Sequence, residues 1–109
     1  MAKTRGMGLL MLWCDVDPEH EEEFNRWYDG EHIHDICSLP GVVSGRRFNA
    51  QPAVSPNSPP GKYLAIYEIE TDDIGGLMAE MGRRAMAGEM SVSDALDRDS
   101  AQIWIYQQQ

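Results

Sequence analysis

Residues 7–23 read MGLLMLWCDVDPEHEEE, and the change of character within this stretch decides the fold class. Residues 7–16 form a short apolar run, whose periodicity alone fits either a strand or a buried helix. The residues that follow favour a strand, because Asp17 is a good helix N-cap and Pro18 suits the first position of a helix. Glutamates then crowd the first turns, where negative charge favours the positive end of the helix dipole. We therefore expect a strand to end near Val16 and a helix to begin at Pro18.

The rest of the chain continues this alternation of strands and helices. The first helix is expected to reach about Gly30, with a continuation to Ser38 left open, before Leu39-Pro40-Gly41 ends it. The later expected elements are a strand over residues 42–48, a proline-rich loop over 51–61, a strand over 62–70, a helix capped by Thr71-Asp72 and ended by Gly88, and a strand over 101–107. The expected buried stripe of the second helix consists of Ile74, Leu77, Met78, Met81 and Ala85. Residues 91–98 are ambiguous and leave room for a short helical turn.

The order β-α-β-β-α-β predicts a single α+β domain over residues 1–109. It is typical of the ferredoxin-like fold, a four-stranded antiparallel sheet with two helices on one face. Apolar residues alternate onto both faces of the predicted sheet. Because both helices lie on one face, the apolar residues of the other face stay uncovered. Large apolar patches rarely stay exposed, and a second copy packed sheet against sheet is the simplest cover. A homodimer is therefore expected.

Composition excludes several classes of partner. The chain has 109 residues, with 18 acidic against 9 basic side chains and a formal net charge of -9. This balance disfavours nucleic acid and anionic membrane surfaces. No run approaches the roughly 20 apolar residues of a membrane span, and the apolar start lacks a signal-peptide cleavage site. Cys14 and Cys37 lack C-x-x-C spacing and are expected to be structural thiols. A cytoplasmic protein is the expectation.

Residues 24–35 hold the densest candidate chemistry. On a continuous helix, Tyr28, His32 and Asp35 share a face with Phe24, at steps of four, four and three residues. His32 would then be a general base or acid, Asp35 would orient its ring, and Tyr28 would donate a hydrogen bond. The alternative is structural: His32 and Asp35 would tie the end of the helix to the following loop.

A metal site in the same segment is a weaker alternative. Glu31, His32, His34 and Asp35 offer ligands of the two-histidine, one-carboxylate type. Two histidines two residues apart on a helix diverge, so they could share a metal only if Gly30 broke the helix. We predict no metal and no cofactor.

The predicted substrate-binding residues are mostly aromatic, and they are Trp13, Phe24, Trp27, Arg46, Phe48 and Tyr67. Arg46 and Arg47 point to opposite faces of their strand, and one of them could reach an anionic substrate group. Met78, Met81 and Met86 fit core filler or an adaptable apolar pocket.

The stretch from Glu21 to Phe48 resembles a known family. The resemblance lies in Glu23-Phe24-Asn25-Arg26-Trp27-Tyr28-Asp29, Glu31-His32, Asp35, Leu39-Pro40-Gly41 and Arg46-Arg47-Phe48. This pattern resembles the EthD-like branch of the dimeric α+β barrel superfamily. The resemblance implies a ferredoxin-like fold, a sheet-to-sheet homodimer and a pocket between sheet and helices in each subunit. His32 and Asp35 match the family pattern Glu-His-x-x-Asp, whereas His34 stands where proline is often found.

The resemblance implies a range of activities on small apolar or aromatic metabolites. We expect cofactor-independent acid–base chemistry of isomerase, cyclase or lyase type, with His32, Asp35 and Tyr28 as catalytic residues. One alternative is a monooxygenase that is cofactor-free or linked to haem. Another is a non-catalytic ligand-binding or stress-associated dimer. The loop over residues 51–61 could act as a lid.

Overall fold

The computed structural model describes residues 6–51, 58–90 and 92–109. Its strands are β1 (Met7–Val16), β2 (Val42–Asn49), β3 (Tyr63–Glu70) and β4 (Leu96–Gln107). Its helical segments are η1 (Pro18–His20), α1 (Glu21–Trp27), η2 (Tyr28–His32), α2 (Ile33–Cys37) and α3 (Ile74–Met86). Residues 52–57 of the expected lid loop, and residue 91, lie outside the described residues.

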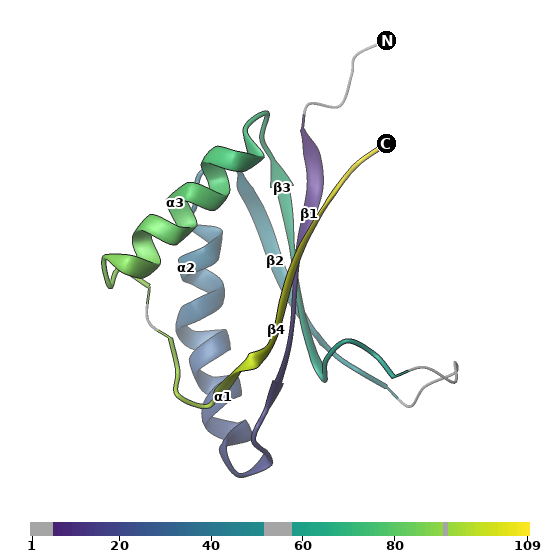
Figure 1. The fold of residues 1–109 in the computed structure, drawn as a ribbon, viewed down its shortest axis with the longest axis vertical. Coiled ribbons are helices and arrows are strands. Elements are labelled where there is room, and N and C mark those ends of the chain that lie inside the picture. The colour runs from purple at the N-terminus through teal and green to yellow at the C-terminus, as the bar shows by residue number, and fades with distance from the viewer. Residues whose placement is uncertain (1–5, 52–57, 91) are drawn as a thin grey trace.

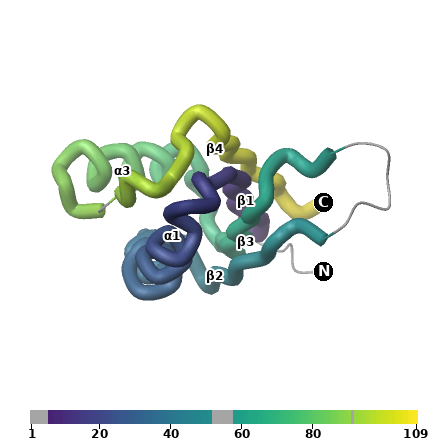
Figure 2. The backbone as a smooth tube through the Cα atoms, turned by 90° about the horizontal axis from the view of Figure 1, so that it is seen from below, coloured from purple at the N-terminus to yellow at the C-terminus, as the bar shows by residue number. Residues whose placement is uncertain are grey.

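The four strands form one sheet in the order β2-β3-β1-β4, and every neighbouring pair is antiparallel. The helices lie together on one side of this sheet, as Figures 1 and 2 show. Leu10 lies in the middle of β1 and pairs with Tyr67 of β3 and Ile105 of β4. The predicted ferredoxin-like α+β fold is confirmed.

The first helix begins as its sequence predicts. The Asp17 carboxylate accepts a hydrogen bond from the Glu19 amide, and Pro18 takes the first helical position. The helix then continues to Cys37, past Gly30, so the longer of the two expected lengths is the observed one.

The segment η2 interrupts this helix with a π-helical turn. The Ile33 amide bonds to the Tyr28 carbonyl, five residues back instead of four. The wider turn accommodates one extra residue and rotates the rest of the helix relative to an uninterrupted α-helix. Phe24, Tyr28 and Ile36 therefore form the buried stripe at successive steps of four and eight residues.

Two sequence expectations for the helix α3 need correction. The N-cap of α3 is Asp73, not Thr71-Asp72, because the Asp73 carboxylate accepts from the Gly76 amide at 2.8 Å. The Thr71 hydroxyl instead accepts from the Asp73 amide. On α3, Leu77 is the buried residue and Ala85 is exposed. The expected stripe is therefore only partly buried.

The last strand begins earlier than predicted, at Leu96 instead of Ala101. Its first part pairs with β1 across a register shift between Trp13 and Asp15, and the Ser100 hydroxyl accepts from the Asp15 amide. Residues 97–100 are polar and lie on an edge strand, where charged side chains are common. Because these residues lack hydrophobic alternation, the sequence pattern did not predict a strand there.

The two faces of the sheet differ in how they are covered. Buried side chains on the helix side include Leu10, Ala65, Tyr67 and Ile69. The opposite face holds Phe48, Trp104 and Tyr106, which are between 44% and 60% exposed. We call this the open face of the sheet. It also carries the half-buried side chains of Leu9, Met11, Leu64 and Ile66.

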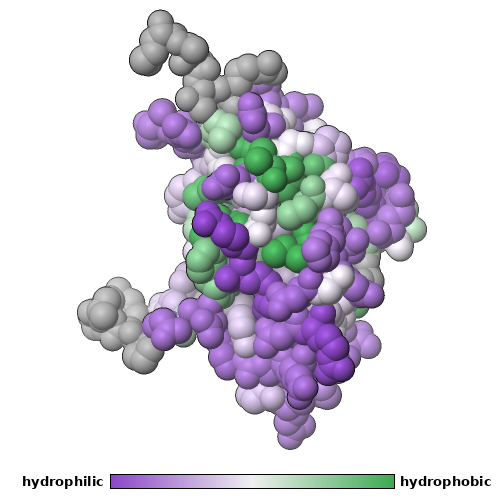
Figure 3. Space-filling view, turned by 180° about the vertical axis from the view of Figure 1, so that it is seen from behind, coloured by the Kyte–Doolittle hydropathy of each residue, from purple (hydrophilic) through white to green (hydrophobic). Residues whose placement is uncertain are grey.

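From behind, hydrophobic side chains gather in the upper half of the molecule, and the lower half is polar (Figure 3). Within the described residues, no helix is both long and apolar enough to span a membrane.

Candidate active site between the sheet and the helices

A cavity of about 320 Å³ lies between the helices and the sheet. Its wall is almost entirely apolar and includes Trp13, Trp27, Tyr28, His32, Met78 and Met81. Pockets of this size and character are typical of small-molecule sites, in which a few polar groups fix the orientation of the ligand. The structure therefore brings four of the predicted site residues, Trp13, Trp27, Tyr28 and His32, to one cavity.

His32 is held in this wall by two aromatic contacts. Its ring stacks on Trp27, with centroids 4.5 Å apart and planes 20° apart, and it meets the Tyr28 ring edge-on at 4.8 Å. Its Nδ1 is buried and has no hydrogen-bond partner. Burial lowers the pKa of His32 below its usual range, while the charge of Asp35 opposes this shift. The imidazole is therefore neutral at neutral pH.

Asp35 does not make the hydrogen bond to His32 that its spacing predicts. The π turn rotates the following residues, so Ile36 rather than Asp35 continues the buried stripe. The Asp35 carbonyl accepts from the Ser38 hydroxyl, and its carboxylate acts on His32 only through its charge. A periodicity calculation with a fixed α-helical turn could not have found this rotation.

Tyr28 and Tyr67 form a buried pair at the base of the cavity. The Tyr67 hydroxyl donates to the Tyr28 oxygen at 3.3 Å. Burial raises the pKa of Tyr28 to about 12 and raises that of Tyr67 as well. Both phenols are therefore neutral, and the Tyr28 oxygen accepts the bond from Tyr67 while it keeps its own proton.

The two neighbouring arginines lie on opposite faces of the sheet, as predicted, but Arg47 is the one on the helix side. Its guanidinium lies 4.5 Å from the centroid of the Tyr28 ring. Arg46 is on the open face and pairs with Glu68 at 3.5 Å. Arg46, a predicted substrate-binding residue, therefore lies away from this cavity, because strand alternation gives opposite faces without saying which one the helices cover.

The other predicted binding residues do not line the cavity. Phe24 and Tyr67 are fully buried in the core beneath it. Phe48 borders a separate polar pocket of about 510 Å³, together with Asn25, Asp29, Arg47 and Tyr63. Met86 is 93% exposed and is not part of the cavity wall.

Sequence reasoning missed several residues of the cavity wall, namely Leu12, Met90, Leu96 and Ile103. Their apolar character and spacing were visible in the sequence, but a cavity wall and a filled core have the same pattern.

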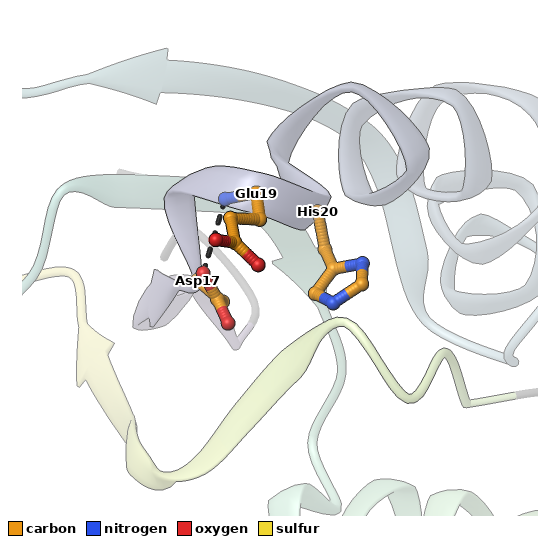
Figure 4. A group of neighbouring side chains, drawn as sticks. All are labelled: Asp17, Glu19 and His20. Atoms are coloured by element: carbon orange, nitrogen blue, oxygen red, sulfur yellow. Dashed lines mark hydrogen bonds between the residues drawn. The ribbon is translucent and has the colours of Figure 1, made fainter.

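The described residues contain one group of potential metal ligands, Asp17, Glu19 and His20, and all three are exposed (Figure 4). The Asp17 carboxylate already caps the helix start, where the figure marks its bond to the Glu19 amide. The alternative set around Glu31 and His34 does not bring three ligand atoms together among the residues described. Exposed acidic groups of this kind are common and do not define a site.

No model of a known protein family matches the chain, and no curated protein matches its sequence. Solved structures do match. A haem degrader from Mycobacterium tuberculosis, solved with two haems in its active site, gives a TM-score of 0.62 at 12% identity over 92% of this chain and 93% of that one. A protein assigned as a monooxygenase from Shewanella loihica PV-4 gives 0.61 at 12% identity over 95% of each chain. An EthD family protein from Bacillus halodurans C-125 gives 0.53 at 14% identity over 95% of this chain and 99% of that one.

The chain has the fold of the dimeric α+β barrel superfamily. The predicted resemblance is confirmed at this level, since an EthD family protein is among the matches. Identities of 12% to 14% mean that the fold is what these proteins share. Proteins that share one fold can catalyse different reactions, so the function of this chain has to be argued from its site.

Proposed function

We propose that this protein binds a small hydrophobic or aromatic metabolite in the cavity and catalyses a cofactor-independent proton transfer of isomerase, cyclase or lyase type. The proposal rests on His32, whose buried Nδ1 has no hydrogen-bond partner in the wall of an apolar cavity. Leaving such a group unsatisfied costs about 1–3 kcal/mol. A ligand that reaches this nitrogen after a small rotation of the imidazole ring, and donates a proton or a hydrogen bond to it, recovers this free energy.

Each polar residue of the wall then has a role. Neutral His32 takes the proton as general base, and the negative charge of Asp35 favours the imidazolium that forms. Tyr28 donates a hydrogen bond to the oxygen on which negative charge develops. Tyr67 donates to the Tyr28 oxygen and so holds the phenol with its own proton free. Positioned proton transfer of this kind contributes about 10²–10⁴-fold to a rate.

We also propose that two copies pack through the open face of the sheet. Phe48, Trp104 and Tyr106 lie exposed on this face, beside a row of half-buried aliphatic side chains. Monomers rarely leave such a contiguous apolar surface in water. The proteins of similar fold belong to a superfamily of dimeric barrels, which supports the same arrangement.

The lining fits haem poorly. The described residues of the wall include no Lys or Arg that would pair with the two propionates of haem. A haem-linked monooxygenase is therefore not proposed, although one protein of similar fold binds haem. A carrier without catalytic activity is the alternative, and the experiment below separates it from an enzyme.

The binding part of the proposal is tested with two matched probes, 1-naphthol and 1-methoxynaphthalene, which differ in whether they donate a hydrogen bond. Calorimetry is expected to give an affinity about tenfold higher for 1-naphthol, as one hydrogen bond of roughly 1.4 kcal/mol predicts. His32→Phe removes this preference, whereas His34→Phe, on the exposed side of the same helix, keeps it. Failure of both probes to bind rules out the proposed cavity site.

The catalytic part is tested with 2-tetralone, a two-ring ketone with acidic C–H bonds beside its carbonyl. The protein is expected to accelerate exchange of these protons for deuterium, measured by NMR in D₂O, by at least about 10²-fold over buffer. His32→Phe abolishes the acceleration and His34→Phe retains it. Binding of the probes without any exchange would identify a carrier instead of an enzyme.

A further inference from the structure

Arg47 carries a positive charge into the space between β2 and the first helix. Only 12% of its side chain is exposed. One terminal nitrogen donates to the Asp29 carboxylate and the other to the Asn25 side-chain oxygen, each at 2.8 Å. These two bonds fix the plane of the guanidinium, which reduces the freedom that a long side chain would otherwise have.

The guanidinium lies against aromatic rings. It is 4.5 Å from the centroid of the Tyr28 ring, and 5.3 Å and 5.4 Å from those of Tyr63 and Phe24. A cation at this distance from a ring interacts with its π electrons, and the interaction strengthens when water is excluded. Tyr28 has the shortest of the three contacts and is almost fully buried.

Tyr28 separates this charge from the cavity. Tyr28 lines the cavity, and Arg47 is not among the described residues of the wall. The other titratable groups near Tyr28 are Tyr67 from β3, Cys14 from β1 and His32 from η2. Burial raises the pKa of Tyr67 and Cys14 and lowers that of His32, so all three are neutral at neutral pH.

We propose that Arg47 is a positioning residue that acts on the ligand through Tyr28. Its guanidinium, held on the Tyr28 ring, strengthens the hydrogen bond that the Tyr28 hydroxyl donates to a negatively charged oxygen in the cavity. The preferred ligand is accordingly one that carries or develops an oxyanion, such as a phenolate or an enolate. This inference rests on the proposed function, since it places the ligand in the same cavity. Arg47 also lowers the pKa of Tyr28, in opposition to burial, which agrees with its position.

Asp29 provides a second way to change the same charge. Its carboxylate pairs with Arg47 but is 68% exposed at the surface. Replacing it with Asn removes a negative charge beside the guanidinium without disturbing the core. Loss of Arg47 and loss of the Asp29 charge should therefore shift the acidity of Tyr28 in opposite directions.

The test measures Tyr28 itself in the ligand-free protein. A difluorinated tyrosine is incorporated at position 28, so that the phenol titrates where the protein stays folded, and ¹⁹F NMR follows its ionisation. Arg47→Gln is expected to raise the pKa of this phenol by about one unit, a tenfold change in its ionisation constant. Arg47→Lys restores part of the effect, and Asp29→Asn lowers the pKa. Arg46→Gln, the matched control on the open face, leaves it unchanged.

Equal titration curves for Arg47→Gln and Arg46→Gln would overturn the proposal. If Arg47→Gln does not fold, the Asp29→Asn variant tests the proposal instead. An unchanged pKa of the phenol at position 28 in Asp29→Asn contradicts the proposal too. Since this measurement needs no ligand, it is independent of whether the cavity binds a metabolite.

A second measurement extends the test to the cavity. The phenol 4-nitrophenol ionises near neutral pH, and its phenolate absorbs visible light, so its ionisation when bound is read directly. Arg47→Gln is expected to reduce the ionised fraction of bound 4-nitrophenol and Arg46→Gln is not. An equal fraction in both variants, with the probe bound, contradicts action on the ligand.

Discussion

The imidazole of His32 lies flat on the indole of Trp27, with ring centroids 4.5 Å apart. The two residues are five positions apart, a spacing at which side chains of an α-helix point in different directions. They meet because η2 is a π-helical turn, in which the hydrogen bond spans five residues. Such turns are frequent at functional sites, and this one places a neutral histidine in the wall of the cavity.

The first prediction concerns the effect of His32 on stability at mildly acidic pH. Burial holds the folded-state pKa of His32 below its ordinary value of 6.5. The unfolded chain therefore binds a proton that the folded protein does not. The contribution of His32 to the free energy of unfolding is complete above the unfolded pKa, and it is lost as the pH falls through the folded value.

Urea unfolding, followed by tryptophan fluorescence between about pH 7 and pH 5, measures this effect. The urea midpoint is expected to fall with pH in the natural protein and in His34→Phe. The slope is expected to flatten in His32→Phe. A slope that survives in His32→Phe would place its origin in another group.

The second prediction concerns the length of the π turn. Gly30 lies within η2, and a Cβ added there meets nothing within 4 Å. Gly30→Ala is therefore expected to stabilise the protein by about 0.5–1 kcal/mol, since alanine favours helix. Deleting Gly30 instead removes the extra residue of the turn, and the resulting seven-residue step from Tyr28 keeps Ile36 on the buried face of a regular α-helix, where it is now 1% exposed.

The deletion is therefore expected to cost much less than the roughly 2–5 kcal/mol for truncating a buried isoleucine to alanine. Thermal unfolding of both variants against the natural protein measures the two effects. A deletion that costs as much as such a truncation would mean that Ile36 does not return to the core when the extra residue of the turn is removed.

The third prediction concerns the buried pair of phenols. Tyr28→Phe leaves the Tyr67 hydroxyl without its acceptor and is expected to cost about 1–3 kcal/mol. Tyr67→Phe removes the donor from the Tyr28 oxygen and is costly for the same reason. Replacing both removes the two polar groups together, so the double variant should lose less stability than the sum of the single ones. Additive losses in chemical unfolding would show that the hydroxyls do not interact.

The fourth prediction tests the open face as the dimer interface. Trp104→Glu places a charge on this face, where the indole is now 55% exposed, and is expected to convert a dimer into a monomer. Burying an unpaired charge in an apolar interface is strongly unfavourable. Met86→Glu, at a position that is 93% exposed on α3, is the control and should leave the assembly unchanged. Sedimentation of the three proteins distinguishes the states, and a monomeric natural protein would contradict the arrangement.

Local rules in the sequence predicted the elements that depend on neighbouring residues. The apolar run that precedes Asp17-Pro18 sets the end of β1 and the start of the first helix, because capping and proline geometry act over a few residues. The element order then restricts the topology to few choices, and the ferredoxin-like sheet is among them. The sequence also predicted that Tyr28 and His32 lie together, because they occupy adjacent turns of one helix.

The tertiary structure decided the features that depend on the rotation of the first helix at η2 and on which face of the sheet the helices cover. The π turn, which a fixed helical period cannot contain, buried Ile36 in place of Asp35 and brought Trp27 onto His32. Alternation placed Arg46 and Arg47 on opposite faces, but only the packing of the helices put Arg47 on the side of Tyr28. Local propensity is a property of neighbours along the chain, whereas a cavity and the charge beside it are made by residues that meet only after the sheet and helices have packed.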